Sequence, residues 1–131
     1  ALLGQGEADF VQGCRARRAD GAVRRAAAAV GRLSRRCLLG DRTRDTGCGL
    51  RAMRSDVARA LPLDLEGMHR FLPYLARELG ARVVEVPVSH RPRRAGKSHY
   101  GLGDRGVAGL ADLLAVRWMA RRRRRPEVFR P

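Results

Sequence analysis

The chain has 131 residues, a length that suits one domain or part of one. Its hydrophobic fraction of 44% argues against wholesale disorder, and no run approaches the ~20 apolar residues that a membrane-spanning helix needs. The formal net charge is +15, from 28 Lys and Arg against 13 Asp and Glu. This charge predicts anionic partners: phosphates, nucleic acid or acidic lipid.

The first third of the chain predicts a strand, a helix and a loop. Ala8–Gly13 is apolar and ends at a glycine, which favours a short buried strand, and Arg15 follows it closely. Ala22–Leu39 predicts a helix, because alanine and arginine favour helices and apolar residues recur at helical spacing. Gly40 is expected to end it, and the polar segment Asp41–Gly49 is expected to be a loop.

Shorter elements are expected next. Leu50–Arg54 favours a short strand, and Ser55 is expected to cap a brief helix over Asp56–Ala60. An amphipathic helix is expected over Met68–Leu79, with Pro73 tolerated within its first turn.

The last third begins with the clearest strand, Arg82–Ser89, in which Pro87 indicates the edge of a sheet or the end of the strand. His90–Arg105 is a long, basic, glycine-rich loop. Asp104 is expected to cap a final helix over Arg105–Arg122. The alternation predicts an α/β fold with few strands and covering helices.

Two basic clusters are candidate anion sites. In the long loop, arginine forks match phosphate oxygens and glycines allow close backbone approach, so a pyrophosphate or phosphomonoester would fit; a solvated basic loop is the alternative. Arg15 stands near a strand end, where α/β proteins place ligands. Arg24 and Arg25 begin a helix, where an anion would relieve their repulsion with the helix dipole, unless all three simply face water.

Other residues give weaker indications of a ligand-binding, reactive or metal-binding site. Asp45 and Gly47 lie on a glycine loop before a strand, where they could orient a sugar or a helix. The three cysteines form no CxxC pair and are expected to be reduced, buried thiols. The acidic pair Asp64 and Glu66 is expected to lie in a plain loop, and the three histidines are too far apart to be assigned as a metal set. No catalytic residue or metal ligand can be assigned in this chain.

The final helix has two interpretations. Its apolar face bears Trp118 and is followed by Arg121–Arg125, which suits a helix lying on an anionic membrane surface. A core helix with a basic tail is the alternative. Aromatic residues make up only 5% of the chain, so no specific nucleic-acid partner is expected.

Four segments together resemble a known family: DFVQGCR, RDTGCGLRAMR, GMHRFLPYLA and VVEVPVSHRPRRAGKSHYGLGDR. Their order and spacing are similar to the C-terminal half of family 2 glycosyltransferases, in the branch of dolichol-phosphate mannose synthase and bacterial polyprenyl-phosphate sugar transferases. The resemblance implies the GT-A (Rossmann-like) fold over residues 1–122, followed by a basic tail at 123–131. It also implies a nucleotide-sugar donor, a divalent metal (Mg or Mn), a polyprenyl-phosphate acceptor and a cytoplasmic location at the inner face of the membrane.

The resemblance also implies roles for individual residues. Arg93, Lys97 and Ser98 would hold the donor pyrophosphate. The acceptor phosphate would be met by Arg15 together with Arg24 or Arg25, and Asp45 and Gly47 match the loop before the central strand. Family members often carry a serine near positions 27 and 28, where this chain has alanine.

The donor-binding strands and acidic metal motif of the family have no counterpart in this sequence. We therefore expect the chain to be a fragment that is inactive alone, and to belong to an enzyme that transfers a sugar to a polyprenyl phosphate. The alternative is a small basic module that binds nucleic acid or anionic membrane through charge, without catalysis.

Overall fold

The computed structural model describes residues 2–15, 22–63, 66–89 and 102–122, without the side chains of Arg24 and of residues 102–107. The long basic loop with Arg93, Lys97 and Ser98 lies outside the described residues, as does the tail from residue 123.

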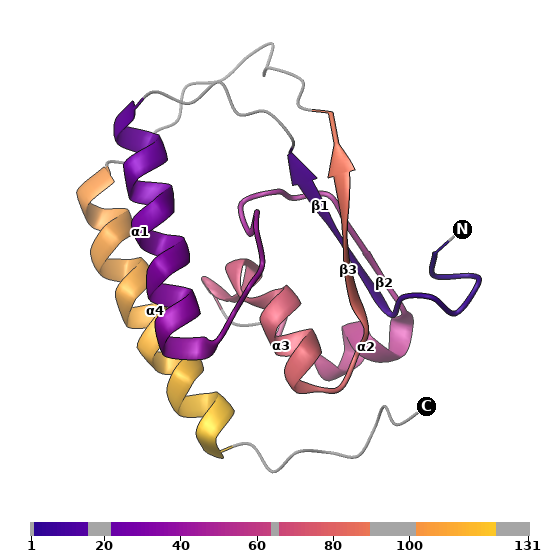
Figure 1. Ribbon diagram of the computed structural model, residues 1–131. Helices are drawn as coiled ribbons and strands as arrows, with labels where there is room; N and C mark the ends of the chain where they lie inside the picture. Colours follow the sequence, from indigo (N-terminus) through magenta and orange to yellow (C-terminus); the bar gives the residue numbers. More distant parts are fainter. Residues whose placement is uncertain (1, 16–21, 64–65, 90–101, 123–131) are drawn as a thin grey trace.

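A three-stranded mixed sheet lies at one side of the molecule, in the order β2–β1–β3 (Figure 1). The central strand β1 (Phe10–Arg15) runs parallel to β3 (Val83–Val88), with Phe10 opposite Val83 and Arg15 opposite Val88. It runs antiparallel to the short β2 (Arg51–Met53). The prediction of an α/β fold with few strands is confirmed. β1 continues to Arg15, so this arginine is the last residue of the strand and does not follow it.

In the described part of the chain, four α-helices accompany the sheet. The long helices α1 (Ala22–Leu39) and α4 (Leu102–Arg122) lie side by side, away from the strands (Figure 1). The short helices α2 (Ser55–Ala60) and α3 (Leu72–Glu78) lie nearer to the sheet. The helix expected at 22–39 is confirmed with these bounds, and Gly40 follows it with a φ of 69°, a conformation that favours glycine.

Three details of the expected helices were wrong. Arg54, not Ser55, is the N-cap residue of α2, and no side chain caps this helix. The single helix expected at 68–79 is a 3-10 turn, η1 (Met68–Arg70), followed by α3 with Pro73 in its first turn, because proline lacks the N–H that a continuous helix would need there. The last helix begins at Leu102, so Asp104 lies inside it and does not precede it.

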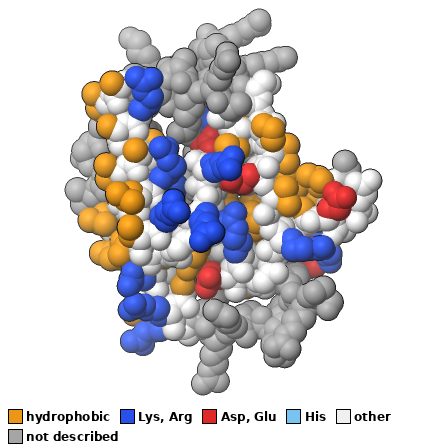
Figure 2. Space-filling view, viewed as in Figure 1, with side chains coloured by type: hydrophobic (Ala, Val, Ile, Leu, Met, Phe, Trp, Pro, Cys, Tyr) orange, Lys and Arg blue, Asp and Glu red, His pale blue; other side chains and the backbone are white. Residues whose placement is uncertain are grey.

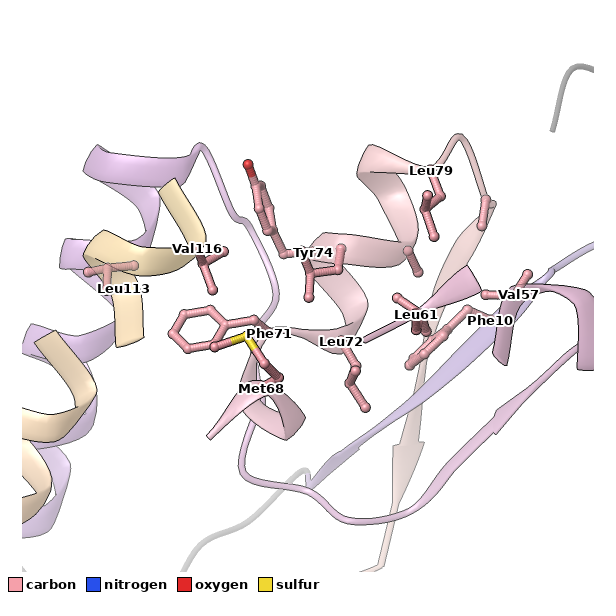
Figure 3. Close-up of a cluster of buried hydrophobic side chains, with 13 residues drawn as sticks. Phe10, Val57, Leu61, Met68, Phe71, Leu72, Tyr74, Leu79, Leu113 and Val116 are labelled. Carbon is pink, nitrogen blue, oxygen red and sulfur yellow. The ribbon is translucent and has the colours of Figure 1, made fainter. Parts of the chain in front are cut away.

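The hydrophobic core joins the sheet to α4 through α3 (Figure 3). Phe10 and Val57 are fully buried at the sheet end, Phe71 and Leu75 occupy the middle, and Val116 closes the cluster on α4. Removing these side chains from water supplies about 1.5–3 kcal/mol each toward folding. This core fixes where β1 ends relative to α1, which is the arrangement that the candidate site needs.

The prediction that all three cysteines are buried was wrong. Cys48 is buried and Cys14 is half-buried, but Cys37 is exposed on α1. The apolar stripe of α1 is exposed as well at Val23, Val30 and Leu33. Helical spacing shows which residues share a face, but it does not show whether anything covers that face.

Candidate anion site

An open hollow of about 780 Å³ lies between α1, the end of β1 and the loop that follows α1. Figure 2 shows basic side chains gathered between α1 and the sheet, around a few acidic ones. The hollow is lined by Cys14, Arg15, Arg25, Ala28, Arg32, Leu33, Arg36, Asp41, Arg42, Thr43, Arg44 and Asp45.

Arg15 enters the hollow from the end of β1 and is held by the loop. Its Nε lies 2.7 Å from Asp45 Oδ2 and its Nη2 lies 3.0 Å from Asp45 Oδ1, which is a bidentate ion pair. The Asp45 carboxylate also accepts hydrogen bonds from the backbone N–H of Arg15 at 3.2 Å and of Gly47 at 3.1 Å. Paired bonds between two charged groups fix orientation as well as distance, so the guanidinium plane of Arg15 is set by Asp45.

Gln12 of β1 forms hydrogen bonds with the same loop. This residue was not singled out from the sequence. Its side chain is fully buried in the central strand. The Nε2 atom lies 3.1 Å from the carbonyl oxygens of both Asp45 and Cys48, and Oε1 accepts a hydrogen bond from Arg51 Nε at 2.8 Å. A polar residue inside an apolar strand was the available signal, because a buried amide requires partners.

A second carboxylate, Asp41, orders the turn after α1. Its Oδ1 accepts hydrogen bonds from the N–H of Thr43 at 2.9 Å and from the Thr43 hydroxyl at 2.6 Å. Arg35 of α1 lies 3.4 Å from Asp41 Oδ2 through Nε, and it donates from Nη1 to Thr46 Oγ1 at 2.7 Å. Burial lowers the pKa of Arg35, and the charge of Asp41 opposes this effect. Arg35 therefore ties the helix to both halves of the loop.

Positive charge remains in excess once these pairs are formed. Five of the lining arginines are exposed: Arg25, Arg32, Arg36, Arg42 and Arg44. Three of them recur on one side of α1, which contains no acidic residue. The carboxylates of Asp41 and Asp45, by contrast, are buried and already bonded. The hollow can therefore accept an anionic ligand, because its two carboxylates are already bonded and its exposed arginines outnumber them.

Cys14 lies in the lining but is poorly suited to nucleophilic chemistry. Burial raises the pKa of its thiol, and the charges of Glu85 and Asp45 raise it further. The thiol therefore stays protonated near neutral pH, and only the thiolate is a good nucleophile.

The described residues do not form a metal site, because no three His, Cys, Asp or Glu side chains among them gather closely enough to hold an ion. The divalent metal implied by the family resemblance was expected to take its ligands mostly from outside this chain, so it stays a prediction.

The known proteins that are similar in sequence to this chain have names of one kind. A dodecaprenyl-phosphate galacturonate synthase of Rhizobium johnstonii is 32% identical over an alignment covering 94% of this chain and 37% of that protein. An undecaprenyl-phosphate mannosyltransferase of Micrococcus luteus is 33% identical over 68% of this chain and 37% of that protein. An undecaprenyl-phosphate 4-deoxy-4-formamido-L-arabinose transferase of Edwardsiella ictaluri is 45% identical over 44% of this chain and 18% of that protein.

The chain is related to polyprenyl-phosphate sugar transferases. The alignments cover between 18% and 37% of the length of these three relatives. No family model matches it. No solved structure matches it either. The family resemblance inferred from the four sequence segments is thus confirmed.

The residues that the sequence predicted for the site can now be compared with their places in the structure. The structure brings Arg15, Arg25 and Asp45 to one hollow, and Ala28 lines it as well. Gly47 does not line it but donates its N–H to Asp45. The side chain of Arg24 and all of Arg93, Lys97 and Ser98 lie outside the described residues, so their predicted roles stay predictions.

Proposed function

We propose that the chain is the acceptor-side part of a GT-A glycosyltransferase that moves a sugar from a nucleotide-sugar to a polyprenyl phosphate. The observation that carries the proposal is the arginine-lined hollow at the end of β1, with Arg15 fixed by Asp45 and with Arg25 on its helical wall. The relatives, which are named as undecaprenyl-phosphate or dodecaprenyl-phosphate enzymes, support the same class of acceptor.

The chemistry needs alignment more than it needs a base. A phosphomonoester has a second pKa of about 6, so the acceptor oxygen is already ionised at pH 7 and no residue has to remove a proton from it. The arginines of the hollow would hold this dianion and offset its repulsion from the donor phosphates. Arg93, Lys97 and Ser98 would hold the donor pyrophosphate in the proposed enzyme, where leaving-group charge develops.

We propose that the intact transferase acts at the inner face of the membrane and that this chain alone binds acceptor without transferring sugar. The proposal can be tested with farnesyl phosphate, a short and water-soluble polyprenyl phosphate, and isothermal titration calorimetry. Arg25→Gln should weaken binding roughly 10- to 100-fold, because a hydrogen bond to a charged group contributes about 1.5–3 kcal/mol.

The matched control is Arg59→Gln, which removes an exposed arginine from α2, outside the hollow, and should leave the affinity within about twofold, as expected of a surface charge. Farnesol, which lacks the phosphate, should not bind at the same concentrations. Equal affinities of the Arg25→Gln and wild-type chains for farnesyl phosphate would contradict the proposed acceptor site.

A second candidate is a basic module that binds anions without catalysis, favoured by the net charge of +15. Such a module would bind inorganic phosphate and farnesyl phosphate alike, and its affinity for nucleic acid would fall steeply and linearly on a log–log plot against salt. A higher affinity for farnesyl phosphate than for inorganic phosphate would favour the transferase over the anion-binding module, since only the transferase requires a lipid acceptor.

A further inference from the structure

Gln12 and Arg51 form a polar pair between two strands of the sheet. The antiparallel register of β1 and β2 places the two residues opposite each other. Arg51 Nε donates a hydrogen bond to Gln12 Oε1 at 2.8 Å. A guanidinium can only donate, so this bond fixes which end of the Gln12 amide is the oxygen and leaves the NH2 end to donate elsewhere. Neither side chain is among those that line the hollow.

The pair holds three backbone carbonyl groups of the loop that follows α1. Gln12 Nε2 donates to the carbonyl oxygens of Asp45 and Cys48, each at 3.1 Å. Arg51 Nη2 donates to the carbonyl oxygen of Thr46 at 3.0 Å. Gln12 is fully buried, so no water is at hand to replace a hydrogen bond that the loop would lose by moving away. The pair therefore fixes the backbone of the loop on both sides of Gly47.

The fixed backbone determines where the Asp45 carboxylate lies. An aspartate side chain has only two torsions, so a shift of its backbone carries the carboxylate with it. Both oxygens of Asp45 accept hydrogen bonds from Arg15, at 2.7 and 3.0 Å. A bidentate pair of planar groups tolerates little displacement, because both bonds depend on the relative orientation of the two planes. The orientation of Arg15 thus depends on Gln12 through Asp45.

A buried amide is an expensive way to fill a position in a strand. An apolar side chain of similar length would need no partners there, whereas a buried polar group costs free energy unless it is hydrogen-bonded. Polar networks whose members are all bonded make a structure rigid and specify one arrangement of it. The Gln12–Arg51 pair has this character, and the arrangement that it specifies is the one that presents Arg15 to the hollow.

We infer that Gln12, held by Arg51, is a positioning residue that sets the orientation of Arg15 before an anion enters the hollow. An arginine that is already oriented loses little side-chain freedom when it meets a phosphate, so the affinity of the site is higher than it would be with a mobile arginine. The inference rests on the proposed function only for the identity of the anion, a polyprenyl phosphate.

Nuclear magnetic resonance of the isotope-labelled chain tests the positioning without any ligand. Arg15 Nε–H donates to Asp45 at 2.7 Å, so its resonance should be protected from exchange with water. The Arg15→Lys variant identifies this resonance as the one that disappears. Gln12→Met keeps the length of the side chain and removes its hydrogen bonds, so the protection of Arg15 should be lost in this variant.

Two further variants separate positioning from stability. Val57→Ala removes part of a fully buried side chain of α2, outside the hollow, so it should destabilise the chain and leave the Arg15 resonance unchanged. Arg51→Met should weaken the protection of Arg15 as well, because the Gln12 amide loses the bond that orients it. Circular dichroism shows which variants are folded, and Arg51→Met decides the question where Gln12→Met does not fold.

Isothermal titration calorimetry with farnesyl phosphate gives the functional readout. Gln12→Met should weaken binding about 2- to 10-fold, the usual effect of having to order one long side chain on binding. Val57→Ala, which affects stability alone, should bind farnesyl phosphate as the wild type does. A role of Gln12 in stability alone would lower the melting temperature and leave the affinity of the folded chain unchanged.

The outcomes separate this inference from the proposed function. Equal protection of Arg15 in the wild type and the folded Gln12→Met chain would overturn the inference, and so would equal affinities of the two chains for farnesyl phosphate. A wild type that does not bind farnesyl phosphate overturns the proposed acceptor site instead. The Arg15 resonance, measured without ligand, then decides by itself whether Gln12 positions this arginine.

Discussion

Single residues at the end of β1 decide how the loop 41–49 meets the strand. Gly13 lets the loop approach closely, since its N–H donates to the carbonyl oxygen of Leu50 at 2.9 Å. A Cβ at Gly13 would lie 3.0 Å from both that oxygen and the sulfur of Cys48. Gln12 and Asp45 supply the polar contacts that this proximity permits.

Gly13→Ala should therefore destabilise the chain by about 1–3 kcal/mol, the usual cost of overpacking a tight contact. The control is Gly31→Ala on α1, where an added Cβ meets nothing within 4 Å and alanine should stabilise by about 0.5–1 kcal/mol. Urea unfolding followed by circular dichroism measures both changes. A Gly13→Ala variant as stable as the wild type would show that the loop can move away from the strand at little cost.

At the scale of elements, ion pairs rather than apolar contacts attach α1 to the loop. Asp41 is wholly buried as a side chain and faces Arg35 of α1 and Arg77 of α3, at 3.4 and 3.3 Å. A buried carboxylate depends on such partners, because an uncompensated charge is strongly disfavoured away from water.

Arg35→Leu should cost about 1–3 kcal/mol in the free energy of unfolding, because the Asp41 carboxylate stays buried and keeps only Arg77 as a cationic partner. Arg35→Leu/Asp41→Leu should recover part of this loss, since the buried carboxylate is removed together with Arg35, and Arg77, which loses its ion pair with Asp41, is partly exposed to water. Thermal or urea unfolding of the two single variants and the double variant completes the cycle. Strictly additive losses would mean that Arg35 and Asp41 do not stabilise each other.

At the scale of the whole molecule, the proposed transfer needs two anion sites, one for each phosphate-bearing substrate. The hollow at β1 supplies one of them. The basic loop with Arg93 would supply the other, on the segment that follows β3. β3 is parallel to β1 and adjacent to it, with Val88 opposite Arg15, so both strands end at the same edge of the sheet.

Arg93→Ala should lower turnover on the order of 100-fold, the usual effect of removing one group that stabilises a developing charge. The assay joins this chain to the donor-binding half of a related transferase and follows sugar transfer to a polyprenyl phosphate. Arg94→Ala is the neighbouring control and should have a much smaller effect. Unchanged kinetics of Arg93→Ala would remove the donor-phosphate role from this residue.

The sequence by itself determined the α/β alternation, the bounds of α1, and the family, because helical spacing, β-branched runs and short motifs are local properties of the chain. Local pattern could not decide what covers each apolar stripe, and Val23, Val30 and Leu33 of the stripe on α1 are exposed. Only the tertiary structure showed that Arg15 forms an ion pair with Asp45, thirty residues away, and that Gln12 donates a hydrogen bond to the backbone of Asp45. Contacts of that kind depend on which elements meet, and the packing of Phe10, Phe71 and Val116 decides this.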